Sequence, residues 1–469
     1  MGNNSWQEVK LSDLGEVARG RSRHRPRYAE HLYGGKYPFI QTGDIKASEG
    51  RISSHGQTYS EAGLAQSRLW PTDTMCITIA ANIAETGILQ YPACFPDSVI
   101  GFIADKNKAD VYFIEYVFRK LRKDIQRQAT GSVQDNINLQ TFERLKFKVP
   151  PVEEQHRIAN VLNHFDKKIT LNRQINQTLE KMAQTLFKSW FVDFDPIIDN
   201  ALDAGFFEQD FAFSDELLRR VEVRKAVRES DNFKPLSEDI RQLFPNAFEE
   251  CTESALGLGG WVPKGWRISK LSDFGNIICG KTPSKKENSF YGNDVPFIKI
   301  PDMHGNVFIT RTFDNLSFEG SKSQIKKLIP EDSICVSSIA TVGLVSITTK
   351  SAHTNQQINS VVPEYKYFRD YLYFSLLNKN KHFHDLASGG STTLNMNTTL
   401  FSNVLFIQPD KFILELFQQQ SGQLLERIKC SQYEIGELTQ LRDTLLPKLI
   451  SGELSLDDIK IDIPEETLI

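Results

Sequence analysis

Eight residues in the second half of the chain match a nucleotide-binding motif letter for letter. Residues 275–282 read GNIICGKT, the GxxxxGK[ST] pattern of a loop whose backbone amides and lysine hold the phosphates of ATP. That chemistry needs a strand before the loop and a helix after it, because the helix N-terminus completes the phosphate site. Pro283, Ser284 and two lysines follow directly and give no helix-starting pattern. We therefore interpret the two glycines as residues that shape a turn, and nucleotide binding as the disfavoured alternative.

A run of alternating arginines near the start of the chain is the second group that could do chemistry. RGRSRHRPR places five guanidinium groups around His24, and lysines occupy the corresponding segment after residue 280. Arginine forks and lysine ammonium groups in a loop match phosphate oxygens and guanine edges, and polar loops nearby supply amides and hydroxyls for base readout. We expect contact with DNA, a solvated basic loop being the alternative. The predicted DNA-binding residues are Arg19, Arg21, Arg23, Arg25, Arg27, Gln41, Thr42, Lys281, Lys285, Lys286, Lys299 and Gln356.

The sequence lacks other signatures of catalysis or metal binding. No GxSxG, HExxH or Asn-Pro-Pro string occurs, and no GxGxxG follows a predicted strand. The six cysteines show no CxxC or Cys/His ligand spacing, so neither a disulfide framework nor a zinc site is expected. The nine histidines form no ligand spacing either. These observations favour a binding module over an enzyme, with no catalytic residue, metal or cofactor.

The segments that must position these residues occur twice. KLSDLG at residues 10–15 recurs as KLSDFG at 270–275, and PFI at 38–40 recurs at 296–298. Further matches follow in the same order as far as Thr185-Leu186 and Thr444-Leu445. The offsets all lie between 256 and 260, which independent coincidences would not produce. The chain is therefore expected to be a tandem duplication.

Each copy has two parts, which together predict an α+β fold. The first part mixes short β-branched and aromatic runs with turn residues and a few helical stretches, as in a globular α/β domain. The second part is one long helix with apolar residues three and four apart, from Val152 to Trp190 in the first copy; Pro447 is expected to end it in the second. The predicted organisation is a globular domain at 1–150, a helix at 151–194, a connector at 195–260, a second globular domain at 261–410, a second helix at 411–450 and a tail at 451–469.

The two long helices are expected to pair with each other as an antiparallel coiled-coil spacer. A helix of roughly 37 residues spans on the order of 55 Å, which exceeds the width of one such domain. Asn172 and Asn176 interrupt the apolar seam and are candidates to fix the register. The alternative is packing of each helix on its own domain. Apolar residues off the seam predict a second stripe on which helices of another protein dock: Val161, Ile175, Met182 and Phe187.

The net charge of −4 conceals an uneven distribution. Residues 1–150 carry 20 basic and 16 acidic side chains, and residues 261–410 carry 16 and 12, so each globular domain has a net charge of +4. The connector at 195–260 carries 7 basic and 15 acidic side chains, and the segment from 411 to the last residue carries 6 and 11. The acidic excess therefore lies in linker and tail, which leaves both globular domains basic enough to attract DNA.

Four strings and one repeated pattern resemble the specificity (S) subunit of type I restriction-modification systems. Both domains open on a Trp-x-x-x-Lys-Leu start, at residues 6–11 and 266–271. The strings are PPVEEQHRIANVL at 150–162, KSWFVDFDP at 188–196, WVPKGW at 261–266 and LPKLISGEL at 446–454. The resemblance covers essentially the whole chain. It implies a non-catalytic subunit with two target-recognition domains that read an asymmetric bipartite DNA sequence, the helices serving as a ruler.

The resemblance also implies the partners. It predicts double-stranded DNA, two methyltransferase (M) subunits that use S-adenosylmethionine to methylate adenine, and ATP-dependent restriction (R) subunits, with no cofactor bound by this chain. Because the two domains share a frame but differ in their loops, the two half-sites should differ.

The absence of a leader and of any run of 18 apolar residues predicts a cytoplasmic protein without a membrane span. The competing hypotheses are an enzyme, either a P-loop nucleotide hydrolase or a fused restriction-modification enzyme, and an assembly scaffold without DNA contact.

Overall fold

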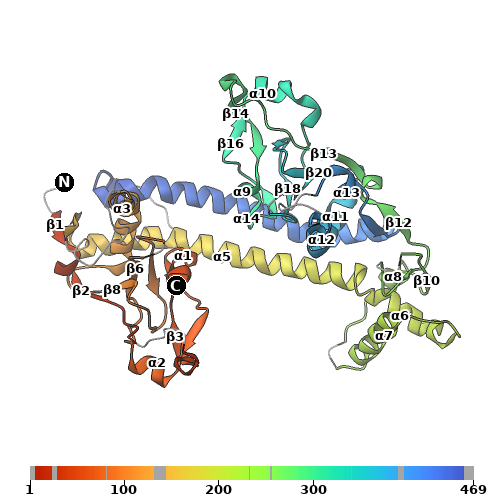
Figure 1. Cartoon of the computed structure of the whole chain (residues 1–469), viewed down its shortest axis with the longest axis horizontal. Helices are drawn as coiled ribbons and strands as arrows, with labels where there is room; N and C mark the ends of the chain where they lie inside the picture. The colour runs from red at the N-terminus through yellow and green to blue at the C-terminus, as the bar shows by residue number, and fades with distance from the viewer. Residues whose placement is uncertain are drawn as a thin grey trace. The chain divides into compact units, whose positions relative to one another are not determined.

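A computed structural model of the chain describes residues 6–23, 29–80, 82–130, 144–231, 233–253, 256–339, 341–388 and 396–458. The chain forms two compact units. Unit 1 consists of Met1–Ile169 and Glu437–Ile469, and unit 2 consists of Thr170–Gly436. Each unit contains one globular domain and a part of both long helices, α5 (Val152–Phe191) and α14 (Lys411–Ser451) (Figure 1). We call the globular domain of unit 1 domain 1 and the globular domain of unit 2 domain 2.

Domain 1 is built on a five-stranded sheet with the order β2-β8-β6-β7-β4. Its central strands are fully buried, and Met75, Ile77 and Phe102 form one core with Phe113 and Ile114 of α3, so that this helix covers the sheet. Only β4 and β7 run parallel; the other neighbours are antiparallel. The elements are β1 (Gln7–Lys10), β2 (Gly15–Arg19), β3 (Tyr33–Phe39), α1 (Thr42–Ala47), β4 (Arg51–Ile52), β5 (Gln57–Tyr59), α2 (Glu61–Ala65), β6 (Met75–Thr78), β7 (Thr86–Leu89), β8 (Val99–Ala104), α3 (Val111–Thr130) and β9 (Lys146–Val149).

Domain 2 repeats this topology. Its five-stranded sheet has the order β13-β20-β17-β18-β15, and the outermost pair, β15 and β18, is again the parallel one. The duplication inferred from the sequence is therefore present in the strand order and in the strand directions. The elements are β12 (Arg267–Lys270), β13 (Gly275–Cys279), β14 (Tyr291–Ile298), α9 (Ile300–Met303), β15 (Phe308–Ile309), β16 (Asp314–Leu316), α10 (Phe318–Ser323), β17 (Ile334–Ser337), β18 (Val345–Thr348), β19 (His353–Thr354), β20 (Ile358–Pro363), α11 (Phe368–Asn378), α12 (Asn380–Ala387), α13 (Thr398–Ser402) and β21 (Leu405–Gln408).

The long helices run antiparallel within each unit. In unit 2 the Asn172 side chain donates to Glu434 Oε2 at 2.9 Å, and the rings of Phe187 and Phe417 pack at 6.0 Å. In unit 1 Asp166 pairs with Arg442, and Ile158 shares a core with Leu449. Residue numbers along α14 therefore decrease in the direction in which those along α5 increase. Pro447 does not end the second helix, which continues to Ser451. The neighbouring side chains Leu446, Leu449 and Ile450 are buried in the core of unit 1, and that burial offsets the roughly 3 kcal/mol that an internal proline costs.

The acidic connector is a folded part of unit 2, contrary to the expectation of a linker. It contains α6 (Asp195–Asp203), α7 (Asp215–Arg228), α8 (Glu238–Arg241) and the strand pair β10 (Phe248–Glu250) and β11 (Trp261–Pro263). Three arginines of α7 each pair with the aspartate 25 positions earlier on α6: Arg220 with Asp195, Arg224 with Asp199 and Arg228 with Asp203. Three of the connector's 15 carboxylates are therefore paired with arginines inside the fold. Among the described residues, no helix combines the length and apolar character that crossing a membrane requires.

Candidate nucleic-acid interface

In each copy the first glycine of the GxxxxG segment begins a strand and the second follows its end, so the expectation that these glycines shape a turn is wrong. Residues 11–13 and 271–273 form short 3-10 turns, and the glycines bracket β2 and β13. A Cβ at Gly20 would lie 2.3 Å from the Pro96 carbonyl oxygen, and a Cβ at Gly280 would lie 2.2 Å from the Asn355 carbonyl oxygen. The second glycine thus allows the strand end to touch a neighbouring loop. Between Cys279 and the 3-10 turn at Asn288–Phe290 no helix occurs, so the phosphate-loop geometry is absent from this segment.

In domain 1 this close approach gathers polar residues from three segments. The Arg21 amide donates to the Phe95 carbonyl at 3.1 Å, which places the end of β2 against the loop before β8. The Gln41 amide donates to Asp44 Oδ2 at 2.8 Å and so caps α1. A cavity of about 130 Å³ is lined by side chains of all three segments: Ser22, Tyr33, Phe39, Gln41, Thr42, Pro96 and Ser98. We call Arg21, Ser22, Gln41, Thr42, Gln57 and residues 96–98 the polar corner of domain 1.

Domain 2 has the equivalent polar corner, formed by Lys281, Thr282, Lys299, Asp314 and residues 355–357. The Lys281 amide donates to the Thr354 carbonyl at 2.9 Å, and Thr282 Oγ1 donates to Gln356 Oε1 at 2.6 Å. The Asn355 amide donates to the Ile298 carbonyl at 3.1 Å, which brings Lys299 to the same place. Three residues that the sequence analysis named from separate segments, Lys281, Lys299 and Gln356, therefore converge in the fold.

Other named residues lie outside the corners. Arg19 is exposed and donates from Nε to the Asp97 carbonyl at 3.1 Å, and Arg23 is exposed in the loop that follows. Lys285 and Lys286 are exposed in the turn before Asn288–Phe290. Arg25 and Arg27 lie outside the described residues.

Gln57 and Asp314 are among the corner residues that were not predicted from the sequence. Each lies on a three-residue strand, β5 or β16, too short to show a periodicity. Only the strand register singles them out, because it sets Gln57 opposite Phe39 and Asp314 opposite Phe297, and the sequence does not give that register.

The four residues expected to form an exposed stripe on α5 differ in their burial. Phe187 is buried in the core of unit 2 against Phe374 and Phe417, so the expectation that it is available to a partner is wrong. It is buried because its ring fills the space between α11 and α14. Val161 is half-buried against the core of unit 1, and Ile175 is half-buried in unit 2. Met182 is 53% exposed.

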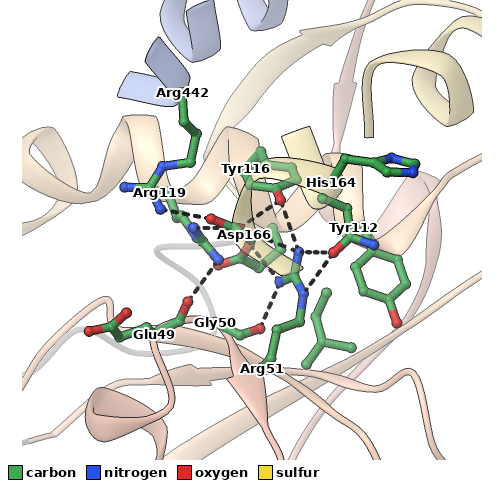
Figure 2. A network of polar contacts seen from close by, with 12 residues as sticks. Glu49, Gly50, Arg51, Tyr112, Tyr116, Arg119, His164, Asp166 and Arg442 are labelled. Atoms are coloured by element: carbon green, nitrogen blue, oxygen red, sulfur yellow. Dashed lines mark hydrogen bonds and ion pairs between the residues drawn. The ribbon is translucent and has the colours of Figure 1, made fainter. Parts of the chain in front are cut away.

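A buried network of charged side chains joins domain 1 to both long helices (Figure 2). Asp166 on α5 accepts hydrogen bonds from Tyr116 Oη at 2.7 Å, Arg119 Nη1 at 3.1 Å and Arg442 Nη1 at 2.7 Å. Glu115, fully buried on α3, accepts from Arg119 Nε at 2.6 Å and from Arg51 Nη1 at 3.3 Å. Burial alone would raise the pKa of Asp166, but the charge of Arg119 and the bonds from Arg442 and Tyr116 outweigh it and hold this pKa below its ordinary value.

Four of the network's charged residues have apolar counterparts in unit 2. At an offset of 259, Asp166 corresponds to Leu425 and Arg442 to Ala183, and both of these are fully buried in the core of unit 2. Glu115 corresponds in the same way to Phe374. Arg51, the residue of β4 opposite Ile88, corresponds by strand register to Phe308, the residue of β15 opposite Ile347. The network of unit 1 therefore has no counterpart at these positions. Domain 2 makes its polar contacts with the helices elsewhere: Arg369 pairs with Glu426 of α14 at 3.6 Å, and Tyr373 Oη donates to Glu180 of α5 at 3.2 Å.

Comparison with known proteins matches one family. The model of the type I restriction modification DNA specificity domain matches residues 3–181 and again 263–440. The chain is 45% identical over 468 residues to the type I restriction enzyme HindI specificity subunit of Haemophilus influenzae, with 96% of this chain and 95% of the relative covered. It is 25% identical over 468 residues to the MjaIX specificity subunit of Methanocaldococcus jannaschii, covering 97% and 94%. The crystal structure of the S subunit from M. genitalium shares the fold, with a TM-score of 0.56 at 14% identity over 96% and 97% of the two chains.

Proposed function

The chain belongs to the family of type I restriction-modification DNA specificity proteins, and from this premise we propose that it reads a bipartite DNA sequence, one half-site with each domain. The observation that carries the proposal is the pair of polar corners. Each corner contains an exposed cationic residue, Arg21 or Lys281, whose backbone amide bonds the neighbouring loop, next in sequence to a hydroxyl residue, Ser22 or Thr282. Amide and hydroxyl side chains lie in the same corners. Cations fix a protein on the phosphates and polar side chains read base edges, so each corner combines both requirements of sequence-specific binding.

Electrostatics support the same assignment. Each globular domain has a net charge of +4, while the chain as a whole has −4. A protein that neutralises Z phosphates loses affinity with a slope of about −0.9Z in log K against log salt. Removing one phosphate contact from each domain should therefore make this slope shallower by about 2.

The rest of the proposed role is assembly. We propose that two methyltransferase subunits and the restriction subunits supply S-adenosylmethionine-dependent adenine methylation and ATP-dependent cleavage, and that this chain directs them without catalysing either step. Leu171, 50% exposed, and Met182, 53% exposed, lie on one face of α5 with the half-buried Ile175. Their spacing of four and seven residues suits the docking of a partner helix. Such a complex would act in the cytoplasm, where its DNA lies.

The test uses the assembled complex and a duplex that carries its target. The double variant Arg21→Ala and Lys281→Ala should bind this duplex roughly 10-fold to 100-fold more weakly at physiological salt, with the shallower salt dependence given above. The matched control is Lys106→Ala with Lys366→Ala. These exposed lysines follow the C-terminal ends of β8 and β20, whereas the corner residues 96–98 and 355–357 precede the N-terminal ends of the same strands. Equal affinity and salt slope in both double variants would contradict the proposal and favour a scaffold without DNA contact.

A further inference from the structure

We propose that one side-chain pair in each polar corner reads a base pair, and that the difference between the two pairs makes the two half-sites different. The pair is Gln41 with Gln57 in domain 1 and Lys299 with Asp314 in domain 2. Gln41 Nε2 donates to Gln57 Oε1 at 2.6 Å, whereas the Lys299 ammonium forms an ion pair with Asp314. This inference rests on the proposed function and adds to it the residues that specify the sequence.

The two pairs occupy the same place in the duplicated fold. Gln41 and Lys299 each follow a PFI segment directly. The phenylalanine of that segment lies opposite the second member of the pair, since Phe39 is the register partner of Gln57, and Phe297 of Asp314. The two domains therefore have equivalent backbone positions here, and the side chains at these two positions differ in their chemistry.

Both domains hold this backbone rigidly. The amide of Gln41 donates to Asp44 Oδ2 at 2.8 Å, and the amide of Lys299 donates to Asp302 Oδ2 at the same distance. The preceding residues, Ile40 and Ile298, are buried in the cores of their domains. A side chain that leaves such a fixed point reaches a base edge with little loss of entropy, because its origin is already positioned.

The side chains themselves remain available. The Lys299 and Asp314 side chains are 36% and 34% exposed, and Gln57 is exposed. Interactions between partly exposed polar side chains contribute little to stability, so DNA can replace them at small cost. The first member of each pair also lies in the same corner as a cationic residue. Gln41 lines a cavity with Ser22, which follows Arg21, and Asn355, which bonds the carbonyl before Lys299, follows the Thr354 carbonyl that accepts from the Lys281 amide. The cation would hold a phosphate while the pair faces the neighbouring base edge.

The chemistry of each pair matches a different base pair in the major groove. A glutamine amide bonds adenine N6 and N7 together, and a second amide can donate to thymine O4, so Gln41 and Gln57 suit A·T. A lysine bonds guanine O6 and N7, and an aspartate accepts from cytosine N4, so Lys299 and Asp314 suit G·C. The proposal therefore predicts an A·T position in the half-site of domain 1 and a G·C position at the equivalent place in the half-site of domain 2.

The experiment transplants one pair into the other domain. The double variant Gln41→Lys and Gln57→Asp is assembled with its methyltransferase subunits, and the methylated adenines are located by sequencing in cells. One position in the half-site of domain 1 should change its preference from A·T to G·C by roughly 10-fold to 100-fold. The half-site of domain 2 should stay as it is. The reciprocal variant, Lys299→Gln with Asp314→Gln, should change only the other half in the opposite sense.

A control pair lies close in sequence to the pair of domain 1, with Lys36 on β3 and Glu61 at the start of α2. Lys36 and Glu61 form an exposed ion pair at 3.0 Å in domain 1, and Lys36→Gln with Glu61→Gln should leave both half-sites unchanged. If the transplanted pair lowers the yield of folded complex, the truncation Gln41→Ala with Gln57→Ala keeps the test decisive, because it should relax the same single position.

The outcomes separate the inference from the proposed function. A motif that stays the same at every position in both the transplant and the truncation overturns the role of the pair, while the function stands. Methylation that shows no dependence on domain 1 in any variant, including replacement of the whole domain, overturns the function itself.

Discussion

Removing the carboxylate of Asp166 should selectively weaken unit 1. Asp166 is 7% exposed and accepts three hydrogen bonds, two of them from guanidinium groups. Asp166→Leu leaves Arg51 and Arg119 with Glu115 as their carboxylate partner, and leaves Arg442 with Asp443, whose side chain is 59% exposed. Breaking a buried ion pair on one side costs about 3 to 5 kcal/mol. Because the Arg442 side chain is 19% exposed and can reach water, we expect a loss of about 2 to 4 kcal/mol.

The structure also supplies the compensating change. Unit 2 places Leu425 and Ala183 where unit 1 has Asp166 and Arg442. The double variant Asp166→Leu with Arg442→Ala should therefore be less destabilised than the two single variants added together, with a coupling energy of about 1 to 2 kcal/mol. This favourable coupling arises because the second change removes a guanidinium that has lost its buried carboxylate and keeps only the exposed one of Asp443.

Amide hydrogen exchange resolved by segment measures these differences in the intact chain. Exchange in α3 reports the opening of unit 1, and exchange in α11 of unit 2 serves as the internal control, which should not change. Global melting is less suitable, because a chain with two units need not unfold in one step. Strictly additive losses in the double variant, or an Asp166→Leu loss below about 0.5 kcal/mol, would refute the reasoning about the network.

Two other predictions follow from the helices and their network. Because its neighbours hold the pKa of Asp166 below its ordinary value, its contribution to stability is complete above the unfolded-state pKa of about 3.9 and is lost as the pH falls through the lower folded-state pKa. The opening free energy of α3 should thus fall more steeply below about pH 4 in the natural chain than in Asp166→Leu, and parallel curves would contradict this. Deleting residues 173–176 of α5 together with 432–435 of α14 removes about 6 Å from each helix, so the unread gap between the half-sites should shorten by about two base pairs. A gap of unchanged length in the methylated motif would refute the role of the helices as a ruler.

The duplication and the long helices were predictable because their signals extend over many residues. Two copies of one pattern at a nearly constant offset produced two sheets with the same strand order. The seam of α5 likewise follows from its three-and-four spacing. A pattern that repeats over many residues is predicted correctly even when single positions within it are assigned wrongly.

Features that depend on what lies opposite a residue were not predictable. Gly20 and Gly280 match a turn or a phosphate loop in sequence, and only the facing carbonyls of Pro96 and Asn355 explain them. In the sequence nothing distinguishes the arginines of α7 from exposed surface charges. Only the fold shows that they pair with the aspartates of α6. The placement of the corner residues also depends on contacts that the sequence does not show. Lys281, Lys299 and Gln356 were named by residue type, but their convergence requires the contacts between three separate segments.

The central claim is that each domain reads its own half of the target. Sequencing of methylated adenines in cells carrying the complete system tests it directly, when this chain is compared with a hybrid whose domain 1 comes from the HindI specificity subunit. The account predicts a two-part, non-palindromic motif with unread base pairs between its halves, of which the hybrid keeps the half read by domain 2 and changes the other. A motif without a gap, or a hybrid that alters both halves or neither, would contradict it.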